Sequence, residues 1–208
     1  MLNTMNKLRK REKVLIVCTG DSITEQNYHV HGHLNYAGQL SEKLIDTFGR
    51  TSFVFNTGVS GQSTWGAVPR LHQDVLRFQP DLVTFMYGIN DSKMGKDGIP
   101  DFKRNLESCV EAVREAGSEI VLLTQNVIVL DTNEEAVVQR QSYPEYVTAI
   151  REVAALLQVP LCDIYSKWSS LMEADPQAHS RMMDDTLHPN EQGHRFMART
   201  LFDYLELG

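Results

Sequence analysis

The sequence predicts an α/β fold in which a five-stranded parallel sheet is covered by helices on both faces. Short β-type runs alternate with longer helical patterns, and five such runs occur, at 13–18, 51–55, 81–87, 119–124 and 159–162. Several of them are almost continuously apolar, as strands covered on both faces should be. Repeated strand–helix alternation produces right-handed crossovers, and therefore parallel strands.

The helical patterns between these runs are supported by apolar spacing and by signals at their ends. Residues 102–116 carry an apolar stripe at 3.6-residue spacing, and Gly117 is a good stop signal directly after it. Similar helices are expected at 35–48, 64–78, 143–157 and 191–206. Asn190 follows Pro189 and is a good N-cap for the last of them.

Length and charge narrow the class of protein. The chain has 208 residues, which predicts one domain over 1–208, with 1–12 as a basic N-terminal extension. Its formal net charge is −7, with a pI near 5.5. Nucleic acid and anionic membranes both require a basic face, so neither is expected as the main partner.

The N-terminal region and the cysteines favour a cytoplasmic protein. The apolar run behind the basic residues 7–13 has only about five residues, fewer than the 7–15 of a signal peptide. No run approaches the roughly 20 apolar residues of a membrane span. The three cysteines are far apart in sequence, as expected of buried, reduced thiols.

Small and polar residues follow the first three predicted strands. These groups are Gly20-Asp21-Ser22, the stretch Asn56 to Gln62, and Gly88-Ile89-Asn90-Asp91. Because the carboxyl ends of parallel strands meet at one edge of a sheet, we expect the three groups to gather there. A fourth group, Asp185 to Asn190, precedes the final helix and can fold over that edge.

The four groups contain the parts that acyl transfer requires. Ser22 is a candidate nucleophile, but a serine needs a base to activate it. Asp185 and His188 are three residues apart, so the carboxylate can bond one ring nitrogen and leave the other facing Ser22. The Gly61 N–H, the Ser22 N–H and the Asn90 side-chain amide are candidate oxyanion donors.

These four blocks resemble those of the SGNH subgroup of GDSL-type esterases and lipases, in the family's order and over the chain from Lys13 to the last helix. The resemblance implies Ser22 as nucleophile, the Asp185–His188 pair as its support, and Gly61 and Asn90 as oxyanion donors. It also implies a three-layer flavodoxin-like sandwich, the SGNH hydrolase fold. Enzymes of this family need no metal or organic cofactor, so the resemblance implies none here. The first block continues with Ile23 rather than Leu. Ile89 stands where many relatives carry a second glycine, beside the proposed hole.

We therefore expect a serine esterase that cleaves carboxylic esters through an acyl-enzyme. Its partner would be a small-molecule ester, with short acyl groups such as acetyl on sugars or small alcohols. A thioesterase or lysophospholipase of the same fold remains open, as does a non-catalytic small-molecule-binding domain. A phosphoryl-transfer domain using Asp21 is disfavoured, because Ile23 stands where a second carboxylate would hold Mg²⁺. The sequence leaves the oligomeric state open, and a homo-oligomer remains possible.

Other residues near these blocks have two interpretations each. Asp21 is expected to support its loop by accepting backbone hydrogen bonds. The alternating His29, His31 and His33 suggest zinc, but no acidic or cysteine partner follows at ligand spacing, so polar residues near the pocket mouth are favoured. Segment 125–142 is either a lid or substrate loop, or an ordinary surface loop. Trp65 and Tyr36 line a pocket or pack in the core.

Overall fold

The computed structural model describes residues 2–25 and 28–208. Its sheet contains five parallel strands in the order β2-β1-β3-β4-β5. The strands are β1 Val14–Gly20, β2 Ser52–Asn56, β3 Leu82–Met86, β4 Glu119–Leu123 and β5 Leu161–Cys162. All five overlap the predicted runs, and the three-layer α/β class is confirmed.

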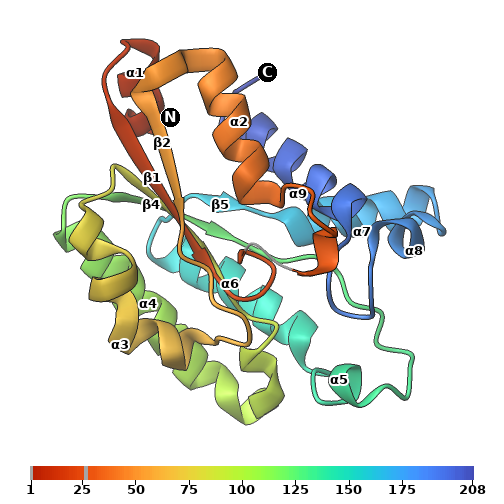
Figure 1. Ribbon diagram of the computed structural model, residues 1–208. Coiled ribbons are helices and arrows are strands. Elements are labelled where there is room, and N and C mark those ends of the chain that lie inside the picture. The colour runs from red at the N-terminus through yellow and green to blue at the C-terminus, as the bar shows by residue number, and fades with distance from the viewer. Residues whose placement is uncertain (1, 26–27) are drawn as a thin grey trace.

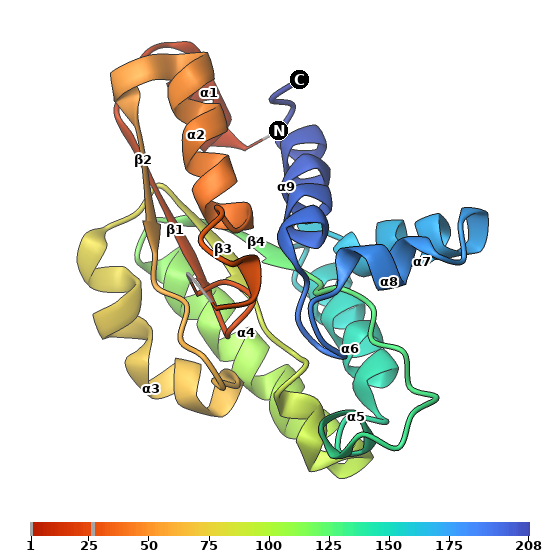
Figure 2. The ribbon, with the colours of Figure 1, turned by 45° about the vertical axis from the view of Figure 1, so that its right-hand side comes forward.

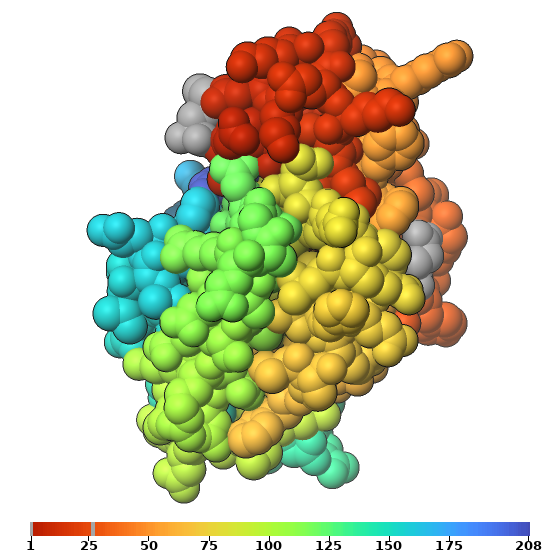
Figure 3. All heavy atoms as spheres, turned by 90° about the vertical axis from the view of Figure 1, so that its left-hand side faces the viewer, coloured from red at the N-terminus to blue at the C-terminus, as the bar shows by residue number. Residues whose placement is uncertain are grey.

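Helices cover both faces of the sheet. Helices α3, α4 and α6 lie on one face, while α2 and α9 pack together on the other (Figures 1 and 2). The space-filling view in Figure 3 shows α3 and α4 side by side over the first face. These five helices are α2 Tyr36–Phe48, α3 Thr64–Asp74, α4 Ile99–Glu115, α6 Tyr143–Leu156 and α9 Glu191–Tyr204.

Both predicted end signals act as expected. The Asn190 side chain accepts hydrogen bonds from the backbone N–H groups of Gln192 and Gly193, at the start of α9. Gly117 has a φ of +83° just after α4, a conformation that glycine adopts without strain.

Several short elements were not predicted. They include the helices α1 Asn3–Arg9, α5 Glu135–Val138, α7 Ile164–Ala174 and α8 Ala178–Met182, and the 3₁₀ turns Tyr28–Val30, Gly49–Thr51, Asp91–Met94 and Lys96–Gly98. The helix expected at 64–78 ends at Asp74 and is followed by a 3₁₀ turn at Leu76–Phe78. Helix α7 begins at the N-cap Asp163 and buries Trp168. None of these elements interrupts the order of the sheet.

The expected basic extension at 1–12 contains a helix that packs on the domain. Met5 and Leu8 of α1 are buried in the core. The Glu119 carboxylate accepts hydrogen bonds from the backbone N–H groups of Asn3 and Thr4, at 2.7 Å each. Lys7 pairs with Asp81 at 2.6 Å. Carboxylates at the amino-terminal edge of the sheet thus hold the first turn of α1 and pair with Lys7.

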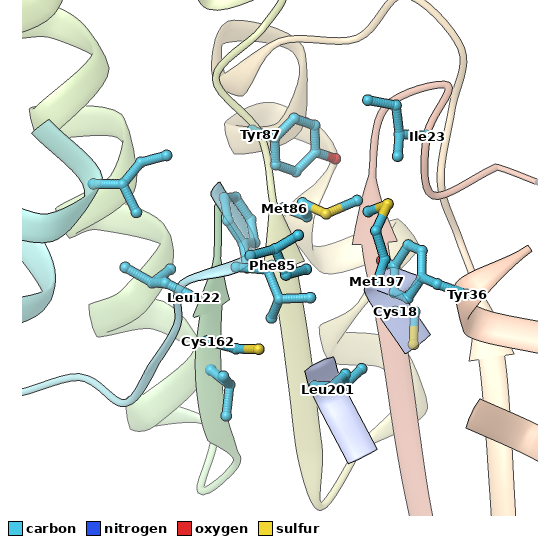
Figure 4. Close-up of a cluster of buried hydrophobic side chains, with 14 of the residues drawn as sticks. Cys18, Ile23, Tyr36, Phe85, Met86, Tyr87, Leu122, Cys162, Met197 and Leu201 are labelled. Atoms are coloured by element: carbon cyan, nitrogen blue, oxygen red, sulfur yellow. The ribbon is translucent and has the colours of Figure 1, made fainter. Parts of the chain in front are cut away.

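One continuous core holds the layers together. Strands β1 and β3 are almost entirely buried, as predicted from their apolar sequences. Figure 4 shows side chains of the sheet meeting those of α2 and α9, among them Cys18, Phe85, Met86, Leu122, Tyr36, Met197 and Leu201. The edge strand β2 is the exception, because Phe53 and Phe55 are 48% and 42% exposed.

The strand order determines where a ligand can bind. The chain moves from β1 outward to β2 and then crosses back to β3. In sheets of this order the direction changes between β1 and β3, and ligands bind outside the carboxyl ends of those strands. The loops that follow β1 and β3 carry Ser22 and Asn90.

Candidate active site

Ser22 lies two residues beyond the end of β1, in a tight turn. The backbone N–H groups of Thr24 and Glu25 donate to the Asp21 carbonyl at 3.0 and 2.9 Å. Gly20 has no room for a side chain, since a Cβ atom would collide with Thr24 and with the Met86 carbonyl of β3. The close contact of β1 with β3 therefore fixes the position from which the turn presents Ser22.

The last loop brings a base to this serine. Ser22 Oγ lies 3.0 Å from His188 Nε2. His188 Nδ1 lies 2.8 Å from Asp185 Oδ2 and 3.1 Å from its Oδ1. The same carboxylate accepts the backbone N–H groups of Leu187 and His188 at 2.7 and 2.6 Å. A proton on Nδ1 satisfies Asp185 and leaves Nε2 as the acceptor for the Ser22 hydroxyl.

Burial and hydrogen bonds set the charges of this pair. Burial lowers the pKa of His188 from its usual 6.5, although the hydrogen bond and charge of Asp185 act in the opposite direction. Burial also opposes ionisation of Asp185, but the two backbone N–H groups and His188 together bring its pKa below the usual value. At neutral pH the site therefore holds a neutral imidazole beside a carboxylate, which are the states a general base needs.

Asp21 supports the turn, and it also connects three strand ends. Its Oδ1 accepts the Ile23 N–H at 3.0 Å. Its Oδ2 accepts the side-chain amides of Gln125 at 2.9 Å and Asn90 at 3.3 Å, from beyond β4 and β3. Burial raises the pKa of Asp21 to about 6, and the hydrogen bonds from Ile23 and Gln125 limit the rise.

The two predicted loop donors border the same pocket as Ser22. These donors are Gly61, which has a φ of +75°, and Asn90. Gly58, in the same loop as Gly61, packs so closely on the backbone of Thr24 and Glu25 that only glycine fits. The pocket has a volume of about 180 Å³. Its lining residues are Asp21, Ser22, Ile23, Ser60, Gly61, Ile89, Asn90, Lys93, Arg140, Leu187 and His188.

The Asn90 amide is held from three sides. Its nitrogen donates to the Gln62 carbonyl at 3.0 Å and to Asp21 at 3.3 Å. Its oxygen accepts a hydrogen bond from Arg140 at 2.9 Å. The bond to Asp21 is the longer of the two, so a substrate oxygen would replace Asp21 as its acceptor first. The amide can therefore serve as an oxyanion donor without rotating by 180°.

The expected histidine trio divides between two acidic residues. His29 and His31 contact the two oxygens of Asp184 at 2.8 Å each, and His33 lies 3.4 Å from Glu191. The His29 ring stacks on His188 with centroids 3.8 Å apart and planes 5° from parallel. The trio therefore does not share one point, and His29 belongs to the active site.

His29, Asp185 and His188 bring potential metal-ligand atoms within 4.8 Å of one another. The two stacked rings are nearly parallel with centroids 3.8 Å apart, so the lone pairs of their nitrogens lie in two separate, parallel planes. A single ion cannot lie on both lone-pair axes, as tetrahedral zinc ligation requires. The arrangement suits hydrogen bonding to Asp184 and Asp185 better than shared coordination.

Sequence reasoning missed the residues that follow β4. Gln125 Nε2 reaches Asp21, and its Oε1 accepts the Ile89 N–H at 2.8 Å. Asn126 donates to the Leu187 carbonyl at 3.1 Å, which holds the loop that carries His188. Both are buried. Their position at a strand carboxyl end was the available signal, the same one that identified Ser22.

Segment 125–142 forms a wall of the site. Its first four residues are buried, and Val137 and Arg140 near its end are buried as well. The two ends of the segment are thus packed into the domain, whereas residues 129–136 between them are exposed or half-buried. Of the two aromatic residues considered for the pocket, Tyr36 is fully buried and Trp65 is 52% exposed at the start of α3.

The fold and this arrangement define a class: an α/β protein with a serine, histidine and aspartate constellation at the switch point of its sheet. The model of the GDSL-like lipase/acylhydrolase family matches residues 18–196, and the chain belongs to that family.

Two curated relatives are acetylxylan esterases. One from Xylanibacter ruminicola is 26% identical over 92% of this chain, which spans only 43% of that protein. One from Geobacillus stearothermophilus is 24% identical over 93% of both chains.

Solved structures show the same fold. The acetylxylan esterase from Geobacillus stearothermophilus superimposes with a TM-score of 0.77 at 20% identity, over 93% of this chain and 94% of that one. An alpha/beta hydrolase from the Lake Arreo metagenome gives a TM-score of 0.77 at 22% identity, over 94% of this chain and 96% of that one.

In the part of the chain that the structure describes, every helix is too short or too polar to span a membrane.

Proposed function

We propose that this protein is a serine esterase that removes short acyl groups, acetyl above all, from sugars or other small alcohols. One observation carries the proposal. Ser22 Oγ meets His188 Nε2 at 3.0 Å, with Asp185 on the far side of the ring, at a pocket of about 180 Å³. Such a volume lies below the usual 300–1,000 Å³ of ligand pockets, and suits a small acyl group.

The geometry supports a two-step reaction. Ser22 Oγ attacks the ester carbonyl while its proton passes to His188 Nε2, and Asp185 stabilises the imidazolium. The tetrahedral oxyanion faces Gly61 and Asn90. The C–O bond to the alcohol then breaks, and the alcohol leaves with the proton from His188. Water repeats the sequence on the acyl-serine, releasing the carboxylic acid and restoring Ser22.

The comparisons support the choice of substrate. Two relatives that align with over nine-tenths of this chain are acetylxylan esterases, so acetylated xylo-oligosaccharides are the first substrates to test. The small pocket disfavours the long acyl chain of a lysophospholipid. We also propose a cytoplasmic location, supported by the three buried thiols of Cys18, Cys109 and Cys162.

The experiment measures kcat/KM for p-nitrophenyl esters from acetate to octanoate, and then for acetylated xylo-oligosaccharides, other acetylated sugars, thioesters and lysophospholipids. We expect acetate to be the best acyl group. A fluorophosphonate should label Ser22 in the wild type and not in His188→Ala. Comparable turnover by Ser22→Ala would refute the mechanism, and a preference for octanoate would refute the short-acyl assignment.

A further inference from the structure

Arg140 reaches the active site from the wall segment 125–142. It follows the short helix α5, and its side chain crosses to the loop after β3, where Nη2 donates to Asn90 Oδ1 at 2.9 Å. Its Nη1 donates to the Ala136 carbonyl, within its own segment. Arg140 is 5% exposed and lines the pocket beside Ser22.

The charge of this guanidinium has no close partner in the part of the chain that the structure describes. Arg140 forms no ion pair there, and its Nε is buried without a hydrogen-bond partner. Burial lowers the pKa of Arg140 below its usual value, and the more distant Asp21 offsets part of the effect. A buried, unpaired cation costs free energy, which nearby negative charge recovers.

The same contact determines which way the Asn90 amide faces. A guanidinium can only donate hydrogen bonds, so the Asn90 atom beside it must be the oxygen. The amide nitrogen must then face Gln62 and Asp21, whose oxygens can only accept. Turning the amide over would place oxygen against oxygen on one side and N–H against N–H on the other.

We propose that Arg140 is a positioning residue for the oxyanion hole, acting through Asn90. It fixes the amide with its N–H groups toward the pocket, and it places a positive charge behind the amide. The negative charge that develops on the substrate oxygen compensates this cation in the transition state and not in the ground state. Differential stabilisation of this kind raises kcat rather than improving substrate binding. The inference rests on the esterase function proposed above.

The test compares Arg140→Met with wild type on p-nitrophenyl acetate. Removing one oxyanion donor typically lowers kcat by about 10²–10³. Because Arg140 acts through such a donor, we expect kcat to fall by about 10–10² with little change in KM. Arg140→Lys keeps a cation that only donates, so it should lose less than Arg140→Met. Guanidinium salts should partly restore kcat in Arg140→Ala.

A double-mutant cycle tests whether Arg140 acts through Asn90. Once Asn90→Ala has removed the amide, adding Arg140→Met should cost little more. Equal losses from Arg140→Met in both backgrounds would overturn the proposal. So would an unchanged kcat, or a loss confined to KM. If Arg140→Met does not fold, Arg140→Lys carries the cycle.

Arg114→Met is the matched control. Arg114 also donates to loop carbonyls, those of Leu157 and Gln158, but it is exposed and lies outside the pocket. It should leave kcat unchanged. An inactive wild type that takes no fluorophosphonate label would refute the esterase function, whereas an active wild type with an equally active Arg140→Met refutes the role of Arg140 alone.

Discussion

The imidazole of His188 is held by Asp185 at one nitrogen, by Ser22 at the other, and by the His29 ring on one face. Stacking fixes the plane of the ring, which no hydrogen bond in the triad does alone. Aromatic pairs contribute about 0.5–1.5 kcal/mol beyond their buried area, so we expect His29→Ala to lower kcat/KM by about two- to tenfold.

Kinetics with p-nitrophenyl acetate test this prediction, with His33→Ala as control. The His33 side chain is 61% exposed and lies near the Glu191 carboxylate rather than against the His188 ring. Equal effects of the two substitutions would show that the stack does not position the base.

The pKa of His188 sets the acid limb of the activity profile. The neutral imidazole is the active form, and burial lowers its pKa below 6.5. Activity should therefore persist as the pH falls through 6.5, and decline only at lower pH as His188 takes up a proton. The pH dependence of kcat/KM measures the limb directly. A midpoint at or above 6.5 would contradict the assignment, and Asp185→Asn should abolish most of the activity over the whole range.

At the scale of the elements, the N-cap of helix α9 contributes both to the stability of the fold and to the geometry of the active site. The Asn190 side chain caps this helix, and its Nδ2 also donates to the carbonyls of Arg181 and Met183 at 2.9 and 3.1 Å. The residue thus holds both ends of the loop that carries Asp185 and His188. Loss of an N-cap costs about 1 kcal/mol, so Asn190→Ala should lower the free energy of unfolding by at least that amount.

Asn190→Ala should also lower kcat, because the loop that presents His188 loses its anchor. Urea unfolding and steady-state kinetics on the same preparation give both quantities. Asn190→Ser keeps an N-cap but lacks the two donors, so it should recover stability more fully than activity. A variant that loses stability and keeps full kcat would show that the loop holds its shape without Asn190.

How far the sequence determines these elements depends on how local their signals are. Asn190 and Gly117 were identifiable because a cap acts within one turn. Helix α7 was missed because three serines lie among its apolar residues and weaken the helical pattern. Ile164, Trp168 and Leu171 nevertheless keep the spacing of a helix. Gln125 and Arg140 carry no motif, and their contacts with Asp21 and Asn90 span 104 and 50 residues. Only the fold brings such pairs together.

At the scale of the whole molecule, strand–helix alternation predicted the layers, and the strand-end rule predicted where the four blocks meet. Neither rule predicts which groups between the layers become buried. Asp21 and Asp91 are each at least 98% buried, and burial raises the pKa of both to about 6. Two carboxyl groups beneath the active site thus oppose the stability of the fold at neutral pH.

The sign of this effect follows from proton binding. The usual pKa of Asp91 is 3.8, so between about pH 4 and pH 6 the folded protein binds the proton more tightly than the unfolded chain. The contribution of Asp91 to stability is therefore present at acidic pH and is lost as the pH rises through about 6. A shift of about 2 pKa units corresponds to about 3 kcal/mol.

Asp91→Asn removes this titration and keeps an oxygen for the N–H and hydroxyl of Thr64. Relative to wild type, the variant should gain up to about 3 kcal/mol in free energy of unfolding between about pH 4 and about pH 8. The new amide group replaces Asp91 Oδ2, which has no hydrogen-bond partner, and this costs the variant a constant free energy at every pH. The cost cancels when the stability difference between variant and wild type is compared at two pH values. Asp203→Asn, which removes an exposed carboxyl, controls for the loss of one negative charge. If wild type and Asp91→Asn unfold with parallel pH dependence in urea, Asp91 is already ionised without penalty, and its burial does not limit the fold.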